Sequence, residues 1–241
     1  ASDGAGIDVA KLCFESDKET LSRTENSQIA IFTHSMAALA ALRENGVAFK
    51  AAAGFSLGEY TSLAAAGVVT LADGVKIVSK RGKLMQHAAD TIDGGMAAIL
   101  GLEDAKIEEA CAAVKNGIVR PVNYNCPGQL VIAGEKAALA EAIENCKAAG
   151  ARRALPLAVS GAFHTPLMAE AAAELRAFVS DFTFSAPTMD IYSNLDGQVY
   201  DCSNLPEHLE QHMISPVRWT RLVQNGMAAG PTSACEVGPG K

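Results

Sequence analysis

A glycine-flanked serine is the strongest chemical signal in the sequence. Residues 54–58 read Gly-Phe-Ser-Leu-Gly, between a short apolar run at 49–55 and a helical pattern at 57–66. A sharp turn from strand to helix lifts the serine hydroxyl out of the backbone, and glycine fits where the turning chain crowds its neighbours. The Leu57 N–H could then point at a developing oxyanion. We interpret Ser56 as a nucleophile; a serine that only caps the next helix is the structural alternative.

A nucleophilic serine needs a base, and His164 is the best placed of the five histidines. It lies in Ser-Gly-Ala-Phe-His-Thr-Pro at 160–166, directly after a predicted strand, where α/β folds place reactive side chains. A loop histidine without a role is the alternative. No Asp or Glu between Ser56 and His164 occupies an obvious loop after a strand, so a Ser-His-Asp triad is not supported. A backbone carbonyl could hold the imidazole instead.

Two other patterns each leave two interpretations open. Arg81 stands between Lys80 and Lys83, where a solvated helix face is the ordinary interpretation and an arginine fork for a substrate carboxylate is the functional one. His208 and His212 are four residues apart on a predicted helix. Solvated helix residues are favoured over a metal pair, because the zinc-protease signature has a Glu directly after its first His. We predict no metal site.

The composition excludes several classes of protein. The 241 residues are 49% apolar and 20% charged, which excludes a disordered chain. A formal charge of −7 without any basic run argues against nucleic-acid binding. No segment reaches the ~18–20 apolar residues of a membrane span, and no signal-peptide pattern is found. The six cysteines are scattered, so free thiols are expected. We expect a cytoplasmic protein that binds neither nucleic acid nor membrane.

The apolar patterns predict an α/β protein with an inserted module. Segment 95–158 has the strand–helix–strand–strand–helix–strand order of a ferredoxin-like unit. Its strands are predicted at 96–100, 118–125, 129–134 and 151–160, and its helices at 103–115 and 136–149. The flanking segments, 1–94 and 159–241, form the predicted large α/β domain. This domain has predicted helices at 28–45, 57–66, 71–89, 167–182, 206–213 and 222–229, and short strands at 49–55, 189–193 and 234–237.

Six sequence blocks, taken together and in order, carry a family resemblance. They are Gly-Phe-Ser-Leu-Gly-Glu-Tyr (54–60), Arg-Gly-Lys-Leu-Met-Gln (81–86), Asn-Tyr-Asn-Cys-Pro-Gly-Gln (123–129), Gly-Ala-Phe-His-Thr-Pro-Leu-Met (161–168), Ser-Pro-Val-Arg-Trp (215–219) and Glu-Val-Gly-Pro-Gly-Lys (236–241). The series resembles the malonyl-CoA:acyl carrier protein transacylases of fatty-acid synthesis. The resemblance implies a hydrolase-like α/β core domain with an inserted ferredoxin-like α+β subdomain. It also implies that a serine-bound acyl-enzyme passes malonyl from malonyl-CoA to the phosphopantetheine thiol of acyl carrier protein.

The resemblance also implies roles for particular residues. Ser56 would be the acylated nucleophile, His164 its general base, and Arg81 the partner of the malonyl carboxylate. His212 stands where the family usually has a glutamine whose backbone carbonyl orients the base. Phe163, beside the base, would leave little room for a branched acyl chain.

Further implications concern the cleft, the partners and the ends of the chain. Asn123 and Asn125 match a motif near the cleft between the domains. No cofactor is implied beyond the substrate malonyl-CoA and the carrier-bound phosphopantetheine, and a monomer is expected. Relatives carry a Gly-Gln-Gly-x-Gln segment that residues 1–12 do not match, and they continue past Lys241, so the chain is expected to be shortened at both ends. A serine thioesterase or hydrolase, or an inactive fragment that only binds carrier protein, stay open as alternatives.

Overall fold

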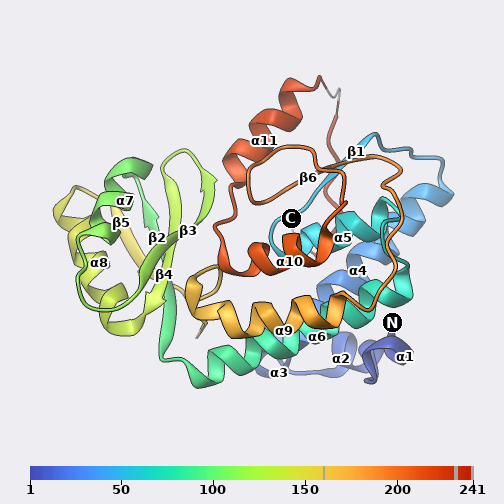
Figure 1. Ribbon diagram of the computed structural model, residues 1–241, viewed down its shortest axis with the longest axis horizontal. Helices are drawn as coiled ribbons and strands as arrows, with labels where there is room; N and C mark the ends of the chain where they lie inside the picture. The colour runs from blue at the N-terminus through green and yellow to red at the C-terminus, as the bar shows by residue number, and fades with distance from the viewer. Residues whose placement is uncertain (160, 231–232, 240–241) are drawn as a thin grey trace.

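Two sheets divide the molecule into a smaller and a larger region (Figure 1). The computed structural model describes residues 1–159, 161–230 and 233–239. The smaller region contains a four-stranded sheet of β2 (Gly94–Leu100), β3 (Val119–Cys126), β4 (Gln129–Glu135) and β5 (Arg153–Pro156). The larger region contains a parallel pair, β1 (Ala51–Ala53) and β6 (Asp190–Tyr192).

The smaller region has ferredoxin-like topology. Its antiparallel sheet has the order β3-β4-β2-β5, and β2 pairs with both β4 and β5. Helices α7 (Asp104–Ala112) and α8 (Lys136–Ala148) pack together and against the sheet. The side chains of Ile99, Leu130 and Ile132 are fully buried in the core between sheet and helices. Apolar residues of the predicted strands and helices thus meet as the sequence pattern requires.

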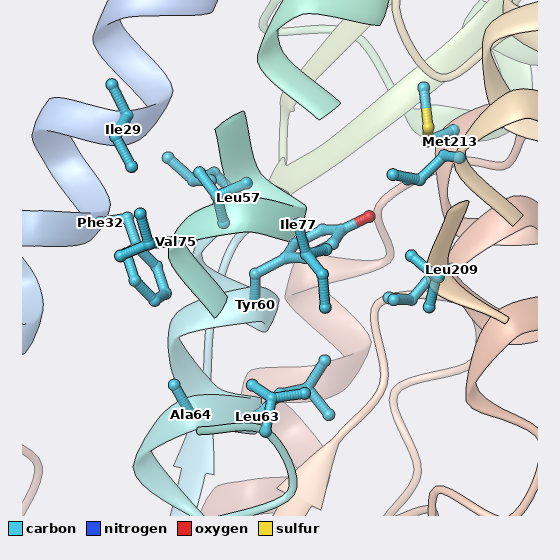
Figure 2. Packing of buried hydrophobic residues seen from close by; sticks show 14 of the residues in the cluster. Ile29, Phe32, Leu57, Tyr60, Leu63, Ala64, Val75, Ile77, Leu209 and Met213 are labelled. Atoms are coloured by element: carbon cyan, nitrogen blue, oxygen red, sulfur yellow. The ribbon is translucent and has the colours of Figure 1, made fainter. Parts of the chain in front are cut away.

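The larger region is mostly helical. Its long helices are α4 (Thr24–Glu44), α6 (Leu71–Thr91) and α9 (Ala169–Val179), of which α6 packs against both others. The nucleophile region adds α5 (Leu57–Ala65), and the C-terminal part adds α10 (Leu205–Ile214) and α11 (Trp219–Ala228). A short 3₁₀ turn, Pro166–Met168, precedes α9. Figure 2 shows side chains from α4, α5, α6 and α10 meeting in one buried cluster, which holds these helices around the chain near Ser56.

The N-terminal segment forms three short helices that the sequence analysis did not predict. They are α1 (Ser2–Ala5), α2 (Val9–Glu15) and α3 (Lys18–Ser22). Asp8 and Asp17 cap the second and third, because their carboxylates accept hydrogen bonds from the N–H groups of Lys11 and Thr20. These two Asp residues were therefore the sequence signal from which the starts of α2 and α3 could have been predicted.

Three predicted strands differ from the structure. The strand predicted at 234–237 is wrong, because these residues are largely exposed and pair with no strand among the described residues. The strands predicted at 49–55 and 151–160 are shorter in the structure, where they correspond to β1 and β5. Ser160 lies outside the described residues. Gly240 and Lys241 of the last sequence block also lie outside them. The domain limits at 94/95 and 158/159 stay a prediction. No helix in the described part of the chain is long and apolar enough to span a membrane.

Candidate active site

Ser56 occupies a strained turn between β1 and α5. Its φ of 48° and ψ of −103° lie outside the regions that serine normally adopts. A Cβ atom on Gly54 would lie 1.9 Å from the Gly58 carbonyl carbon, so only glycine fits there, whereas Gly58 has open space at that position. The Ser56 side chain makes no capping hydrogen bond to α5. The interpretation of Ser56 as a mere helix cap is therefore wrong.

His164 lies against the Ser56 hydroxyl. Its Nε2 is 2.8 Å from Ser56 Oγ, and its Nδ1 is 3.0 Å from the backbone carbonyl oxygen of His212. A carbonyl can only accept, so Nδ1 carries the proton and Nε2 is free to accept the serine proton. Burial, and then the nearby Arg81 cation, lower the pKa of His164 to about 4. The imidazole is consequently neutral at physiological pH, as a general base must be.

Arg81 reaches the same hydroxyl from α6, and only 1% of its surface is exposed. Its Nη2 donates to Ser56 Oγ (3.0 Å), its Nη1 donates to Gln28 Oε1 (2.5 Å), and the guanidinium lies 4.9 Å from the centre of the Tyr60 ring. Among the described residues no carboxylate pairs with it, and its Nε has no partner. Burial lowers the pKa of Arg81. The solvated-face interpretation is wrong for this residue, which is a buried cation lacking an anion.

Leu57 and Phe163 lie next to the reacting groups in the chain. Leu57 is the first residue of α5, so its N–H is one of the unpaired donors at a helix N-terminus, beside Ser56. The half-buried Phe163 packs against the main hydrophobic core of the larger region. It also packs against a small buried cluster of the smaller region, formed by Met96, Val122, Val131 and Ala133. It therefore contributes to the wall between the serine site and the smaller region.

A cavity of about 400 Å³ adjoins His164. Its lining combines His164, Pro166, Ile214 and Pro216 of the larger region with Glu108, Cys111, Ala112, Arg120, Pro121 and Tyr124 of the smaller one. The structure thus places β3 at the cavity through Arg120, Pro121 and Tyr124, residues that the sequence analysis did not single out. Tyr124 belongs to the third sequence block, so the resemblance could have indicated that it lies near the site. Its hydroxyl donates to Glu108 Oε1 (2.6 Å).

Asn123 and Asn125 lie on β3 but are not brought to the serine. Asn123 forms a backbone bridge with Val217, and the Asn125 side-chain amide donates to Gln129 Oε1 (3.2 Å). Within the described part of the chain, no hydrogen bond joins either residue to Ser56 or His164. Both residues lie on β3, the strand that lines the cavity, which agrees with the position near the cleft that the resemblance implied. Their roles stay a prediction.

A buried acid, Glu59, lies beside the site, and the sequence analysis gave it no role. Its Oε1 accepts hydrogen bonds from the Tyr200 hydroxyl (3.0 Å) and from His208 Nε2 (2.5 Å), and its Oε2 lies 3.6 Å from His212 Nε2. The predicted solvated face for the two histidines is therefore wrong, because His212 is 1% exposed and the His208 side chain is also mostly buried. Burial lowers the pKa of His212 far below its usual value. Among the described residues, no group of three His, Cys, Asp or Glu side chains could hold a metal ion.

The fold and this serine–histidine site define an enzyme of the acyltransferase class. The acyl transferase domain family matches residues 2–240. Two malonyl CoA-acyl carrier protein transacylases are similar over 244 aligned residues, which cover 100% of this chain and 79% of each relative. The relative from Salmonella typhimurium is 43% identical, and that from Staphylococcus aureus is 38% identical. The chain belongs to the family of malonyl CoA-acyl carrier protein transacylases.

Solved structures agree with this family. An acyl carrier protein S-malonyltransferase from Vibrio cholerae has a TM-score of 0.94 and 40% identity, over 99% of this chain and 79% of that one. A malonyl-transacylase solved in complex with a type II polyketide acyl-carrier protein has a TM-score of 0.96 and 40% identity, over 99% of this chain and 78% of that one. The family and the fold class predicted from the sequence are both confirmed.

Proposed function

We propose that the chain transfers a malonyl group from malonyl-CoA to the phosphopantetheine thiol of acyl carrier protein, in fatty-acid biosynthesis, through an ester on Ser56. The close relatives with this name support the reaction. The observation that carries the substrate class is Arg81, a buried cation without an acidic partner among the described residues, whose Nη2 is 3.0 Å from Ser56 Oγ.

The position of Arg81 suits an acyl group with a carboxylate one methylene beyond its carbonyl. In malonyl-Ser56 the carboxylate would lie a few bonds from Oγ, within reach of a guanidinium that already touches this oxygen. The carboxylate would be the anion that this buried cation lacks, and it could accept two parallel hydrogen bonds from the guanidinium. An acetyl group would leave the charge unpaired, which is costly in a buried site. The site therefore favours malonyl over acetyl donors.

The groups at the site can carry out both halves of a ping-pong transfer. Ser56 Oγ attacks the thioester carbonyl as His164 Nε2 takes its proton, and the Leu57 N–H faces the developing oxyanion. The C–S bond then breaks, and CoA leaves as a thiol with the proton from His164. The carrier's thiol next attacks the Ser56 ester, again losing its proton to His164, and Ser56 recovers a proton as the C–O bond breaks. No metal or cofactor enters either half.

Transfer rates from malonyl-, methylmalonyl- and acetyl-CoA in Arg81 variants test the substrate class. Arg81→Ala should lose about 10²-fold in malonyl transfer, because charge-assisted bonds contribute about 1.5–3 kcal/mol, while acetyl transfer is kept or gained. Arg81→Lys should recover only part of the loss, since an ammonium cannot form the fork. Lys83→Ala, an exposed cation on the same helix, is the matched control and should leave all three rates unchanged. Equal slowing of all three donors by Arg81→Ala would contradict the carboxylate role.

The same assay separates the proposal from its two alternatives. A hydrolase would release free malonate from the acyl-enzyme faster than it loads the carrier thiol. A fragment that only binds carrier protein would form no acyl-enzyme at all. Transfer to carrier protein that outpaces malonate release supports the transferase.

We also propose that the protein acts in the cytoplasm as a monomer without a cofactor. The six free cysteines suit a reducing compartment. Light scattering should give the mass of one chain, and treatment with EDTA should leave acyl-enzyme formation unchanged. A dimer mass, or loss of activity with EDTA, would contradict the corresponding part of this proposal.

A further inference from the structure

The Asn194 side chain bridges both sides of the Ser56 turn. Its Oδ1 accepts a hydrogen bond from the Ser56 N–H (2.7 Å), and its Nδ2 donates one to the Gly54 carbonyl oxygen (2.7 Å). Asn194 is fully buried, so neither bond competes with water. One planar amide therefore holds the chain at Gly54, two residues before the nucleophile, and at the nucleophile itself.

Glu59, in the first turn of α5, fixes Asn194 in turn. The Asn194 N–H donates to Glu59 Oε2 (2.8 Å), and the Asn194 carbonyl oxygen accepts from the Arg218 N–H (2.9 Å). The other Glu59 oxygen accepts from Tyr200 and His208. A carboxylate with no exposed surface is costly to bury unless both oxygens are hydrogen-bonded, as they are here.

The same carboxylate lies beside the helix that supports the base. Glu59 Oε2 is 3.6 Å from His212 Nε2 on α10, and the backbone carbonyl of His212 holds His164 Nδ1. His212 Nε2 is also 3.4 Å from Asn194 Oδ1. The support of the nucleophile and the support of the base thus meet around Glu59 and Asn194, although these segments are far apart in the sequence.

The Ser56 turn needs such support because its backbone is strained. A residue in a sparsely populated backbone region costs about 1–3 kcal/mol and persists only when its surroundings over-determine it. The strand before the turn, β1, has only three residues, and its pairing among the described residues is with β6. Asn194 follows β6 by two residues, so the neighbouring parallel strand delivers the amide to the turn.

We propose that Asn194, fixed by Glu59, is a positioning residue that holds the Ser56 turn in its reactive conformation and in register with His164. The inference rests on the proposed role of Ser56 as the acylated nucleophile. Asn194 acts through the Ser56 backbone and touches neither the acyl donor nor the carrier thiol. Its loss should slow bond formation at Oγ without weakening the hold of Arg81 on the donor.

The test follows Ser56 with two reagents in Asn194→Ala and Asn194→Asp. The first is a fluorophosphonate probe, with which Oγ forms a bond to phosphorus, fluoride leaves, and the serine proton departs through His164. The second is malonyl-CoA at saturation, with acyl-enzyme formation followed by rapid quench and mass spectrometry. Asn194→Asp keeps an acceptor for the Ser56 N–H, but it places an oxygen instead of an N–H donor toward the Gly54 carbonyl. This variant replaces Asn194→Ala in the test if Asn194→Ala does not fold. Tyr200→Phe removes a bond to the same Glu59 carboxylate and is the matched control.

Both Asn194 variants should react about 10²-fold more slowly per folded molecule with both reagents, since a misplacement near 1 Å costs about this much. The KM for malonyl-CoA should stay within the error of the wild-type value, and Tyr200→Phe should react at nearly the wild-type rate. Unchanged labelling per folded molecule in the Asn194 variants would overturn the proposal. So would a raised KM with kcat unchanged, or equal slowing by Tyr200→Phe.

The two reagents keep this inference distinct from the proposed function. A wild-type protein that reacts with the fluorophosphonate but forms no malonyl ester would refute the proposed function. The role of Asn194 would then be decided by the fluorophosphonate rates of the same variants alone.

Discussion

The two regions of the molecule differ in what they bury. The core of the smaller region, between its sheet and helices α7 and α8, is formed by apolar side chains and two cysteines. The structure describes all of residues 95–158, and none of the buried polar or charged side chains lies there. The larger region buries a cation, an acid, two histidines and an asparagine, namely Arg81, Glu59, His164, His212 and Asn194.

The difference separates folding from chemistry. Apolar burial stabilises the ferredoxin-like unit by roughly 25 cal/mol for each Å² removed from water. Buried polar groups add little net stability and are costly when a partner is missing. Their concentration around Ser56 therefore points to the reaction rather than to stability. Substitutions of the buried polar groups around Ser56 should mainly change the rate, and substitutions in the apolar core of the smaller region should mainly change the free energy of unfolding.

Removal of the base should have the largest effect. His164→Ala should slow acyl-enzyme formation by about 10²–10⁴-fold, because general-base help contributes that much. Rapid-quench measurement with malonyl-CoA gives the rate, and circular dichroism confirms that the variant is folded. A loss smaller than about tenfold would mean that another group accepts the Ser56 proton.

Truncation in the smaller core should affect stability instead. Ile132→Ala should lower the free energy of unfolding by about 2–5 kcal/mol, because Ile132 is fully buried and its loss leaves a cavity. Urea denaturation measures this change, with the exposed Lys106→Ala as control. The rate of acyl-enzyme formation per folded molecule should stay the same. A rate loss as large as that of His164→Ala would erase the distinction between the regions.

The pH dependence should reveal the environment of His164. Because its pKa is lowered to about 4, the neutral base persists in acid, and kcat/KM for malonyl-CoA should fall only as the pH drops through about 4. The unfolded histidine takes up its proton near its ordinary pKa of 6.5 and the folded one only near 4, so stability should decline as the pH falls from about 6.5 to about 4, before the rate does.

Arg81→Ala sharpens this pH prediction. Without the cation, the pKa of His164 should rise toward its ordinary value, so the acidic limb of the profile moves to higher pH. Imidazole NMR titration of the free enzyme measures the same pKa directly. A wild-type value near 6.5 would contradict the buried, neutral base.

The smallest effect is expected at the residue that supports the base. His212→Gln should leave the acylation rate nearly unchanged, because the backbone carbonyl that accepts from His164 Nδ1 is retained. A glutamine amide can also donate toward Glu59 or Asn194 in place of the imidazole. If this conservative change slows acylation strongly, the His212 imidazole itself takes part in the reaction.

Local sequence signals predicted the reacting groups but not the residues that support the Ser56 turn. Ser56 lies in a motif with its own turn geometry, and His164 follows a predicted strand, so both could be found from neighbours in the chain. Asn194 binds the Ser56 N–H across 138 residues, a pairing that exists only once β6 lies beside β1. Arg81 could be read as solvated or buried, and only the packing of α6 against its neighbours decides this.

The fold shows the same limit. Periodic helices and the ferredoxin-like order were predictable, because each depends on local apolar spacing. The strand expected at 234–237 did not form, since strand propensity does not say whether a partner strand is present. The short N-terminal helices were missed because they have few apolar repeats, although Asp8 and Asp17 marked their starts.

Peptide mapping after reaction with malonyl-CoA tests the central claim most directly. The wild-type chain should gain a single malonyl group, and fragmentation should place it on Ser56. Ser56→Ala should gain none, while remaining folded by circular dichroism. A malonyl group on another side chain, such as the exposed thiol of Cys126, or an adduct that persists in Ser56→Ala, would contradict the account.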